Sequence, residues 1–524
     1  MSAAPQSGTP VRTAPWRTRP RLPRRLAIVA VAAVTGAALM VVTGSSSGSA
    51  ATADRGSARD VVANLFEWNW NSVAKECTTV LGPHGYGGVQ VAPPQDSVKR
   101  IALGNGSDTI LHPWWEVYQP VDYNLTSRMG NEAQFKAMVK TCRRAGVKVY
   151  VDAVINHMTG QGSVSYGGKT FTHFDYPGVY TVANFHQKGP DCTSASGGIE
   201  DFNNLIQVRK CELVGLADLR TETDYVRDTL AAYLNKLIGY GVSGFRVDAA
   251  KHIGQPDLAA IESRLHRTAD GTRPYVALEV FGGGPGLLSP FAFQTVGSLL
   301  GLDADVQLKS AFKSYPDAHI GSIATLKVFG EDSGLVPGDH ELSFVQNHDT
   351  ERNGDALNYK DGATNTIANE FLLAYGYGKP QVYASFAWTT PDDSPPSDAN
   401  GLITNTDCNS AAWVCVDRTR GVANMVAWHN HVGDARVTNW WDDGQNVISF
   451  SRGHRGWIAI NNNTSAQTHT FTTGMAAGTY CDIIHSDLAH GSCSGPTVTV
   501  DAGGNATVTI PAKDSIAFDA TDRL

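Results

Sequence analysis

Short apolar segments alternate with segments of helical period along most of the chain. The apolar segments are continuous rather than alternating, which is typical of strands buried on both faces of a parallel sheet. Between them, apolar residues recur on one helix face, as at Phe135, Met138, Val139 and Cys142. A second such face contains Val226, Leu230, Leu234, Leu237 and Ile238. The predicted strands are Val61–Glu67, Gly87–Ala92, Val147–Ile155, Ser243–Val247, Val276–Val280, Val306–Ala311, Glu341–Val345 and Gln381–Phe386. This many strand–helix units favours an α/β fold closed into a (β/α)8 TIM barrel.

Two regions interrupt this rhythm. Residues 158–217 follow the third strand and are rich in Gly, Ser, Thr and Asn. They are too long for a plain loop and predict an inserted small domain. After about residue 432 the helical pattern ends, and short strand-like segments predict a C-terminal antiparallel β-sandwich domain over 433–524. The barrel then comprises 54–157 and 218–432, and we expect no further domain appended to it.

The first 53 residues differ from the rest. They contain six arginines and no acidic residue, followed by an apolar run, Leu26–Val42, and the tripeptide Ala51-Thr52-Ala53. This order is typical of a secretion signal. A membrane anchor is the alternative, but the run is short and is interrupted by Thr35 and Gly36. We therefore expect a secreted, extracellular protein without membrane association after signal removal; the twin-arginine route stays open because of Arg24-Arg25.

Removal of the signal makes the chain more acidic. The formal charge is −8 with six arginines in the signal, so the mature part carries −8 − 6 = −14. An acidic surface argues against nucleic acid or an anionic membrane as a partner. No segment predicts an obligate oligomer, and a monomer is the default expectation.

Eight cysteines lie in the exported portion, at positions 77, 142, 192, 211, 408, 415, 481 and 493. An even count outside the cell favours disulfides, although eight cysteines allow 105 pairings. No C-x-x-C pair occurs, which argues against a zinc cluster. The spacing of the last six favours the pairs 192–211, 408–415 and 481–493.

Polar residues follow several predicted strands. Asp248 ends the fourth strand, Glu279 lies at the end of the fifth, and Asp349 follows the seventh. In barrels of this kind, catalytic groups lie at the carboxyl ends of the strands. One such acid could be a solvated loop residue. Three of them, with histidines nearby, predict a catalytic site.

Four segments around these residues occur in a characteristic order. They are D-x-V-x-N-H from Asp152, G-F-R-V-D-A-A-K-H from Gly244, a glutamate after an apolar strand, and V-x-N-H-D from Val345. Together they resemble the conserved regions of the α-amylase family of glycoside hydrolases over residues 54–524. Further segments, Leu65–Trp68, Gly85–Val91 and Pro113–Pro120, are similar to animal-type α-amylases. The resemblance implies endo-hydrolysis of α-1,4 bonds in starch and maltooligosaccharides.

The resemblance also assigns roles. Asp248 is expected to be the nucleophile, Glu279 the acid and then the base, and Asp349 the residue that stabilises the transition state. Arg246 is expected to keep Asp248 ionised. A retaining mechanism predicts that the carboxyl groups of nucleophile and acid are about 5–5.5 Å apart.

Sugar rings have apolar faces and hydroxyl edges, so aromatic residues with polar neighbours suit them. By resemblance, Trp114, Trp115 and Tyr118 are stacking residues with Gln119 alongside. Core packing is the alternative for the tryptophan pair. The hydroxyl contacts implied by the family are His157, Lys251, His252 and His348.

The resemblance implies a structural Ca²⁺ ion, whose preference is for oxygen ligands. The implied ligands are the side chains of Asn156 and Asp218 and the carbonyls of Arg209 and His252. The ion would hold the insertion against the barrel. The implied disulfides are 77–142, 192–211, 408–415 and 481–493.

The chain departs from the animal-type pattern at three places. Arg246 and Asn347 match two ligands of an allosteric chloride. Gln381 replaces the third ligand, an arginine, so we expect activity without chloride. Lys379 is a positively charged residue nearby in the sequence. The loop 350–362 lacks a glycine-rich run, and Phe202 stands where the family often has tyrosine.

Two other functions stay open from the sequence. A transglycosidase of the same family, such as a cyclodextrin-forming or branching enzyme, would use the same carboxylates. A non-catalytic carbohydrate-binding protein would keep the barrel, but such proteins typically lose the acids that are all present here.

Overall fold

The computed structural model describes residues 59–103, 109–313 and 321–524. The predicted secretion signal, residues 1–53, lies outside the described residues. Within the described ranges, no helix combines the length and apolarity needed to cross a membrane.

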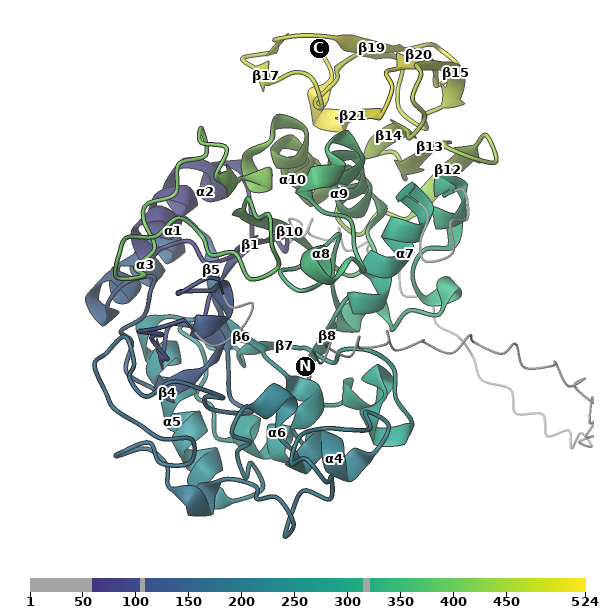
Figure 1. Cartoon of the computed structure of the whole chain (residues 1–524). Helices are drawn as coiled ribbons and strands as arrows, with labels where there is room; N and C mark the ends of the chain where they lie inside the picture. Colours follow the sequence, from purple (N-terminus) through teal and green to yellow (C-terminus); the bar gives the residue numbers. More distant parts are fainter. Residues whose placement is uncertain (1–58, 104–108, 314–320) are drawn as a thin grey trace, which may run out of the picture. The chain divides into compact units, whose positions relative to one another are not determined.

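Eight parallel strands close into a barrel, which confirms the predicted fold (Figure 1). The first and last strands pair in parallel, with Val62 opposite Gln381, and this pairing closes the ring. The barrel strands are β1 (Val62–Leu65), β2 (Gly88–Val91), β5 (Lys148–Ala153), β6 (Gly244–Val247), β7 (Tyr275–Leu278), β8 (Ser298–Leu300), β9 (Glu341–Phe344) and β10 (Lys379–Phe386). Three short strands lie outside the ring: β3 (Asp96–Ser97), β4 (Pro120–Asp122) and β11 (Trp413–Val414).

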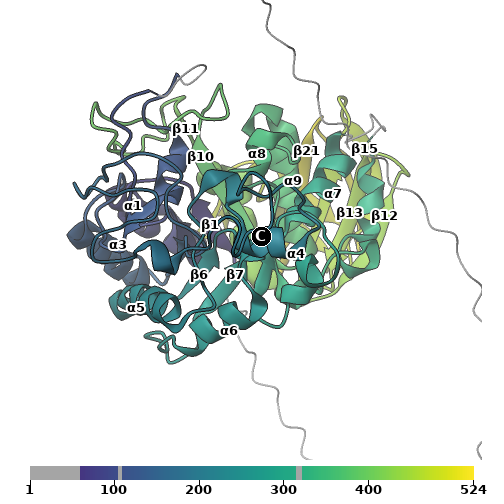
Figure 2. The same ribbon diagram turned by 60° about the horizontal axis from the view of Figure 1, so that its bottom comes forward.

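Helices connect the strands. They are α1 (Trp70–Glu76), α2 (Gly82–His84), α3 (Glu132–Arg144), α5 (Asp224–Tyr240), α6 (Gln255–Ser263), α7 (Leu302–Lys313), α8 (Thr350–Asn353), α9 (Ala363–Tyr375) and α10 (Arg420–Val432). Figure 2 shows α1, α3, α5 and α6 outside strands β1, β6 and β7. Helix α3 begins at a capping box formed by Asn131 and Gln134, and its buried residues are those that the sequence predicted.

The barrel interior changes from apolar to polar along strands β5 and β7. Because side chains alternate across a strand, residues two apart point to the same side. Tyr150 and Ala277 belong to a small buried apolar cluster with Val62, Leu342 and Phe344. Two residues further along these strands come Asp152 and Glu279, which are also buried. The sequence thus places charged groups directly above an apolar layer, at the carboxyl ends of the strands.

The sixth predicted strand was wrong. Residues Val306–Ala311 lie in helix α7, and the sixth strand is β8, which has only three residues. Ala304, Leu308 and Ala311 recur at helical spacing and are buried in the main core. A strand of three residues is too short to produce a recognisable apolar run.

After α10 the chain forms only strands and one short 3-10 turn. A four-stranded antiparallel sheet contains β12 (Val437–Asp442), β13 (Val447–Arg452), β14 (Gly456–Asn461) and β21 (Asp514–Asp519). The remaining strands are β15 (Gln467–Thr472), β16 (Gly478–Cys481), β17 (Leu488–Ala489), β18 (Ser492–Cys493), β19 (Thr497–Val500) and β20 (Asn505–Ile510). In β14, Ile458 and Ile460 join the main core, whereas Trp457 and Ala459 join a second core with residues of β15, β16, β19 and β20. The sheet is therefore buried on both faces, as in a sandwich.

The segment between β5 and α5 has little regular structure. It contains one short helix, α4 (Leu205–Lys210), two 3-10 turns and isolated bridges. One bridge pairs His157 with Asp218, so the two ends of the segment lie together. All four disulfides implied by the family resemblance are present: 77–142, 192–211, 408–415 and 481–493.

Candidate active site

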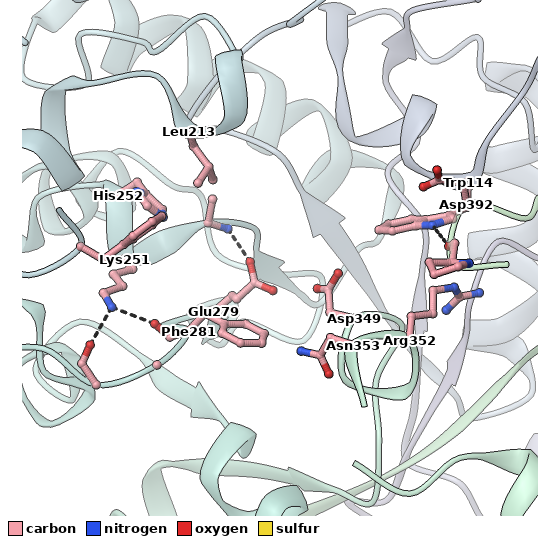
Figure 3. Close-up of a pocket in the computed structure, with 15 residues that line it drawn as sticks. Trp114, Leu213, Lys251, His252, Glu279, Phe281, Asp349, Arg352, Asn353 and Asp392 are labelled. Atoms are coloured by element: carbon pink, nitrogen blue, oxygen red, sulfur yellow. Dashed lines mark hydrogen bonds between the residues drawn. The ribbon is translucent and has the colours of Figure 1, made fainter. Parts of the chain in front are cut away.

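A cavity of about 760 Å³ opens at the carboxyl ends of the barrel strands (Figure 3). Five of the residues predicted from the sequence line it: Trp114, Lys251, His252, Glu279 and Asp349. Further lining residues include Phe202, Phe281, Arg352, Asn353, Pro391 and Asp392. The other residues predicted for catalysis and substrate binding are not among those that line this cavity: Trp115, Tyr118, Gln119, His157, Arg246, Asp248 and His348.

Arg246 is the centre of the buried charges. Its Nη1 donates to Oδ1 of Asp248 at 2.6 Å and to Oδ1 of Asp152 at 2.8 Å. Its Nη2 donates to Oε1 of Glu279. One guanidinium from β6 therefore contacts three carboxyl groups that come from three neighbouring strand ends.

The three predicted catalytic acids influence one another. Burial raises the pKa of Asp248, and Arg246 opposes this rise. Burial raises the pKa of Glu279 as well, and the negative charges of Asp248 and Asp349 raise it further. For Asp349 the rise caused by burial is opposed by Arg246, Arg352 and a hydrogen bond with Glu279. The charges of two neighbouring acids thus favour the protonated form of Glu279, and Arg246 opposes this effect.

The backbone after Asp248 adopts an unusual conformation. Ala249 has φ of 48°, in the left-handed region that non-glycine residues seldom occupy. In this conformation its amide donates to Oε2 of Glu279 at 2.8 Å. A strained residue next to a candidate nucleophile is typical of a functional site.

Two buried histidines, His157 and His348, lie close to the predicted catalytic acids. His348 stacks on Phe66 with ring centroids 4.6 Å apart and on Tyr118 at 5.1 Å, and its Nε2 is 3.3 Å from Oδ2 of Asp349. His157 has its Nε2 3.1 Å from the carbonyl of Tyr118. Burial lowers the pKa of His157 to about 4 and that of His348 well below its ordinary value. Both rings are therefore neutral near pH 7, which suits hydrogen bonding to sugar hydroxyls.

The aromatic residues after β2 are fixed by the loop that follows β10. Trp114 donates from Nε1 to the carbonyl of Pro391 at 2.8 Å, and Trp115 donates from Nε1 to Oδ1 of Asp392 at 3.2 Å. Tyr118 is buried, and its hydroxyl donates to Oδ2 of Asp152 at 2.8 Å. Oε1 of Gln119 accepts from the amide of Gly160. Of this group, Trp114 is the one that faces the cavity.

Lys251 and His252 connect the cavity to neighbouring loops. Nζ of Lys251 donates to the carbonyls of Phe281 and Gly283 at 2.8 and 2.9 Å (Figure 3). Nδ1 of His252 lies 2.9 Å from the carbonyl of Val208 in α4. Lys251 thereby holds the glycine-rich segment after β7 through hydrogen bonds, and His252 holds the end of the insertion in the same way.

Of the four predicted calcium ligands, Asn156 and Asp218 flank the insertion, Arg209 lies within it on α4, and His252 follows barrel strand β6. Nδ2 of Asn156 is 3.4 Å from Oδ1 of Asp218, and both side chains are buried. Arg209 lies in the last turn of α4, where helical carbonyls lack intrahelical partners, and α4 contacts His252 through Val208. Burial raises the pKa of Asp218 to about 7, and Nδ1 of His186 lies 2.7 Å from its Oδ2. A buried carboxylate, an amide and free carbonyls form a donor set that fits a hard cation.

Of the three positions that correspond to an allosteric chloride site, Arg246 and Gln381 make internal contacts, whereas the amide nitrogen of Asn347 makes none in the part of the chain that the structure describes. Nε2 of Gln381 donates to Oε1 of Gln90 at 2.9 Å. Both terminal nitrogens of Arg246 donate to carboxylates. Nδ2 of Asn347 is buried without a hydrogen-bond partner within the described residues.

Several residues of this site were not predicted from the sequence, among them Asp152 and Arg352. Asp152 is buried between Arg246 and Tyr118, and burial raises its pKa to about 7. Asp152 is the first residue of the D-x-V-x-N-H motif that predicted Asn156 and His157 as site residues, so the same motif could have identified it. Arg352 lies in α8 and lines the cavity, but a single arginine in a helix of four residues gives no recognisable pattern.

The sequence of this chain is similar to those of known proteins. The chain matches the α-amylase catalytic domain over residues 116–277 and the α-amylase C-terminal all-β domain over residues 438–521. An α-amylase of Thermomonospora curvata is 42% identical over 504 residues, which cover 94% of this chain and 79% of the relative. An α-amylase-related protein of Drosophila melanogaster is 39% identical over 474 residues, covering 87% of this chain and 92% of the relative.

Solved structures agree. The crystal structure of α-amylase I from Eisenia fetida superimposes with a TM-score of 0.82 at 36% identity, covering 88% of this chain and 98% of that one. A glutamate-to-glutamine mutant of the same enzyme in complex with maltohexaose is equally similar. The catalytic and C-terminal domains, the barrel and these identities lead to one conclusion: the chain belongs to the α-amylase family of glycoside hydrolases.

Proposed function

We propose that the protein is a secreted α-amylase that hydrolyses internal α-1,4 bonds of starch with retention of anomeric configuration. The observation that carries the proposal is the double contact of Arg246 with Asp248 and Glu279. Two carboxyl groups bound by one guanidinium lie close together. This favours the separation of about 5–5.5 Å of retaining enzymes over the about 6.5–9.5 Å of inverting ones.

In the proposed reaction, a carboxylate oxygen of Asp248 attacks the anomeric carbon while Glu279 donates its proton to the departing glycosidic oxygen. This breaks the glycosidic bond and forms a glycosyl ester on Asp248. Glu279, now ionised, takes a proton from a water molecule, whose oxygen attacks the same carbon and releases Asp248. Asp349 stabilises the positive charge that develops on the sugar ring in both steps.

We assign substrate contacts to the residues that face the cavity or support it. Trp114 offers an aromatic face, and His157, Lys251, His252 and His348 offer polar atoms for hydroxyl groups. Trp115, Tyr118 and Gln119 hold the stacking region in place through their own hydrogen bonds. The maltohexaose complex of the earthworm relative supports linear maltooligosaccharides as ligands.

We propose that Asn156, Asp218 and the carbonyls of Arg209 and His252 hold a structural Ca²⁺, with residues 158–217 as the calcium-associated domain. When bound, the ion would supply a crosslink between insertion and barrel rather than a step in catalysis. The proposed activity does not need chloride, because Gln381 is neutral and already bonded to Gln90. The four disulfides support an extracellular location, and we propose a monomer.

Digestion of soluble starch tests the proposal. A hydrolase that cuts internal bonds lowers the viscosity before many reducing ends appear, and its products are short linear maltooligosaccharides. Cyclic or branched products would point to a transglycosidase instead. An unchanged viscosity with folded protein and calcium would contradict the proposed function and favour a carbohydrate-binding role.

A further inference from the structure

Arg352 is a buried cation to which the proposed reaction assigns no role. It lies in α8, three residues after Asp349, and only 4% of its side chain is exposed. Its guanidinium carbon is 5.1–5.6 Å from the ring centroids of Phe66, Trp114, Phe386 and Trp388. A guanidinium stacks on aromatic faces more readily than an ammonium does. These four rings form what we call the aromatic cage.

The hydrogen bonds to His348 and Glu351 use only one nitrogen of the Arg352 guanidinium, so most of the group contacts the aromatic cage. Nη1 donates to the carbonyl of His348 at 2.7 Å and to Oε1 of Glu351 at 2.5 Å. Nε and Nη2 are buried, and the side chain of Tyr383 interacts with the guanidinium. One edge of the side chain therefore holds the backbone beside Asp349, and the rest packs among the rings.

The aromatic cage connects the predicted stacking residue with the carboxylate. Trp114 contacts His348 edge to face with centroids 5.3 Å apart, and His348 stacks on Phe66. His348 directly precedes Asp349, and both Asp349 and Arg352 line the cavity beside Trp114 (Figure 3). A change in the packing around Arg352 would therefore move the aromatic ring and the carboxylate relative to each other.

Several titratable and charged groups face Arg352. Buried Glu67 and Glu351 have pKa values raised by burial to about 8 and about 7, and Arg352 opposes both shifts. The hydroxyl of Tyr383 donates to Glu351, and Arg246 is the second cation that acts on Asp349. Of the acids that Arg352 influences, Asp349 is the one that lines the cavity.

We propose that Arg352 is a positioning residue that fixes Trp114 and Asp349 relative to one another and supplies positive charge beside Asp349. The inference rests on the substrate and transition-state roles proposed above for these two residues. Lysine would keep the charge but lose the flat stacking surface, and leucine would lose both.

Two variants separate these contributions. Arg352→Lys is expected to lower kcat on soluble starch by about 10- to 100-fold, because small displacements of reacting groups have effects of this size. Its acidic limb in the pH profile of kcat/KM should stay in place. In Arg352→Leu the acidic limb should also move to higher pH, because Asp349 then keeps its proton to higher pH. Near-ultraviolet circular dichroism should change in both, since Trp114 and Trp388 lose a neighbour.

Arg264→Lys is the matched control, because Arg264 pairs with Asp224 and Asp228 away from the cavity and should keep wild-type kinetics. Wild-type kcat and an unshifted acidic limb in both Arg352 variants would overturn the proposal. If Arg352→Leu does not fold, the test depends on Arg352→Lys alone. A wild-type kcat in Arg352→Lys would then contradict the positioning role of Arg352. An inactive wild-type enzyme would contradict the proposed function instead. Maltohexaose binding, followed by tryptophan fluorescence, would then replace kcat, and unchanged binding in the variants would contradict the role of Arg352.

Discussion

Arg246 and Asp248 are joined by a hydrogen bond of 2.6 Å between Nη1 and Oδ1. The two residues are separated by one position at the end of β6, so strand geometry directs both side chains into the barrel. The same guanidinium also binds Asp152 and Glu279. One cation thus partly compensates several buried carboxyl groups.

Replacement of Arg246 by glutamine should destabilise the protein by about 3–5 kcal/mol near pH 8, because it leaves buried carboxylates without their counter-ion. The deficit should shrink when the pH is lowered to 5. Burial raises the pKa values of Asp152, Asp248 and Glu279, so these groups take up protons in the folded state and lose the uncompensated charge. Chemical denaturation at both pH values measures this, with Arg246→Lys as the control. A deficit that does not depend on pH would contradict the explanation.

Calcium removal should lower the melting temperature. An ion that binds only the folded state stabilises it by about 4 kcal/mol when its free concentration is about 1,000 times Kd. Chelation should therefore destabilise the wild type and make residues 158–217 sensitive to proteases, and added Ca²⁺ should reverse both effects. Asp218→Asn should need more calcium for the same melting temperature. A wild type that is indifferent to chelator would contradict the proposed ligand set.

Glu370 links the barrel to the C-terminal sheet. It is buried on α9, its Oε2 accepts from Oγ of Ser515 on β21 at 2.5 Å, and burial raises its pKa to about 8. Because the folded-state pKa is raised, this group makes the free energy of unfolding fall as pH rises from about 4.5 to about 8. Glu370→Gln should show a smaller fall between pH 5 and pH 8 than the wild type. Equal slopes for both proteins would contradict this prediction.

Chloride should have no specific effect on activity. Gln381 is bonded to Gln90 and supplies no positive charge. Starch hydrolysis in sodium chloride should match that in sodium nitrate and in sodium acetate at equal ionic strength. A steep activation by millimolar chloride alone would contradict the prediction.

The barrel and much of the site could be predicted because the polar motifs occur directly at the ends of the apolar strands. Continuous apolar strands define the barrel, and motifs such as the one that contains Arg246 and Asp248 mark the strand ends. Strand β8 was missed because three residues give no periodic signal, whereas the adjacent helix α7 contains apolar residues that were mistaken for a strand.

Contacts between distant segments were harder to predict. Trp114 is held by Pro391, and Trp115 by Asp392, 277 residues further along in each case. Arg352 contacts four rings from three separate segments, and no local spacing reveals such an arrangement. These relationships depend on how the loops pack above the barrel rather than on local sequence.

The central claim is a retaining mechanism with Glu279 as the acid and base. The most direct measurement follows the anomeric configuration of the products by proton nuclear magnetic resonance during hydrolysis of a maltooligosaccharide, for the wild type and for Glu279→Gln. We predict that α-anomers appear first with the wild type and that the variant loses about 10²–10⁴-fold in kcat while keeping its fold. Initial β-anomers, or a variant as active as the wild type, would contradict the account.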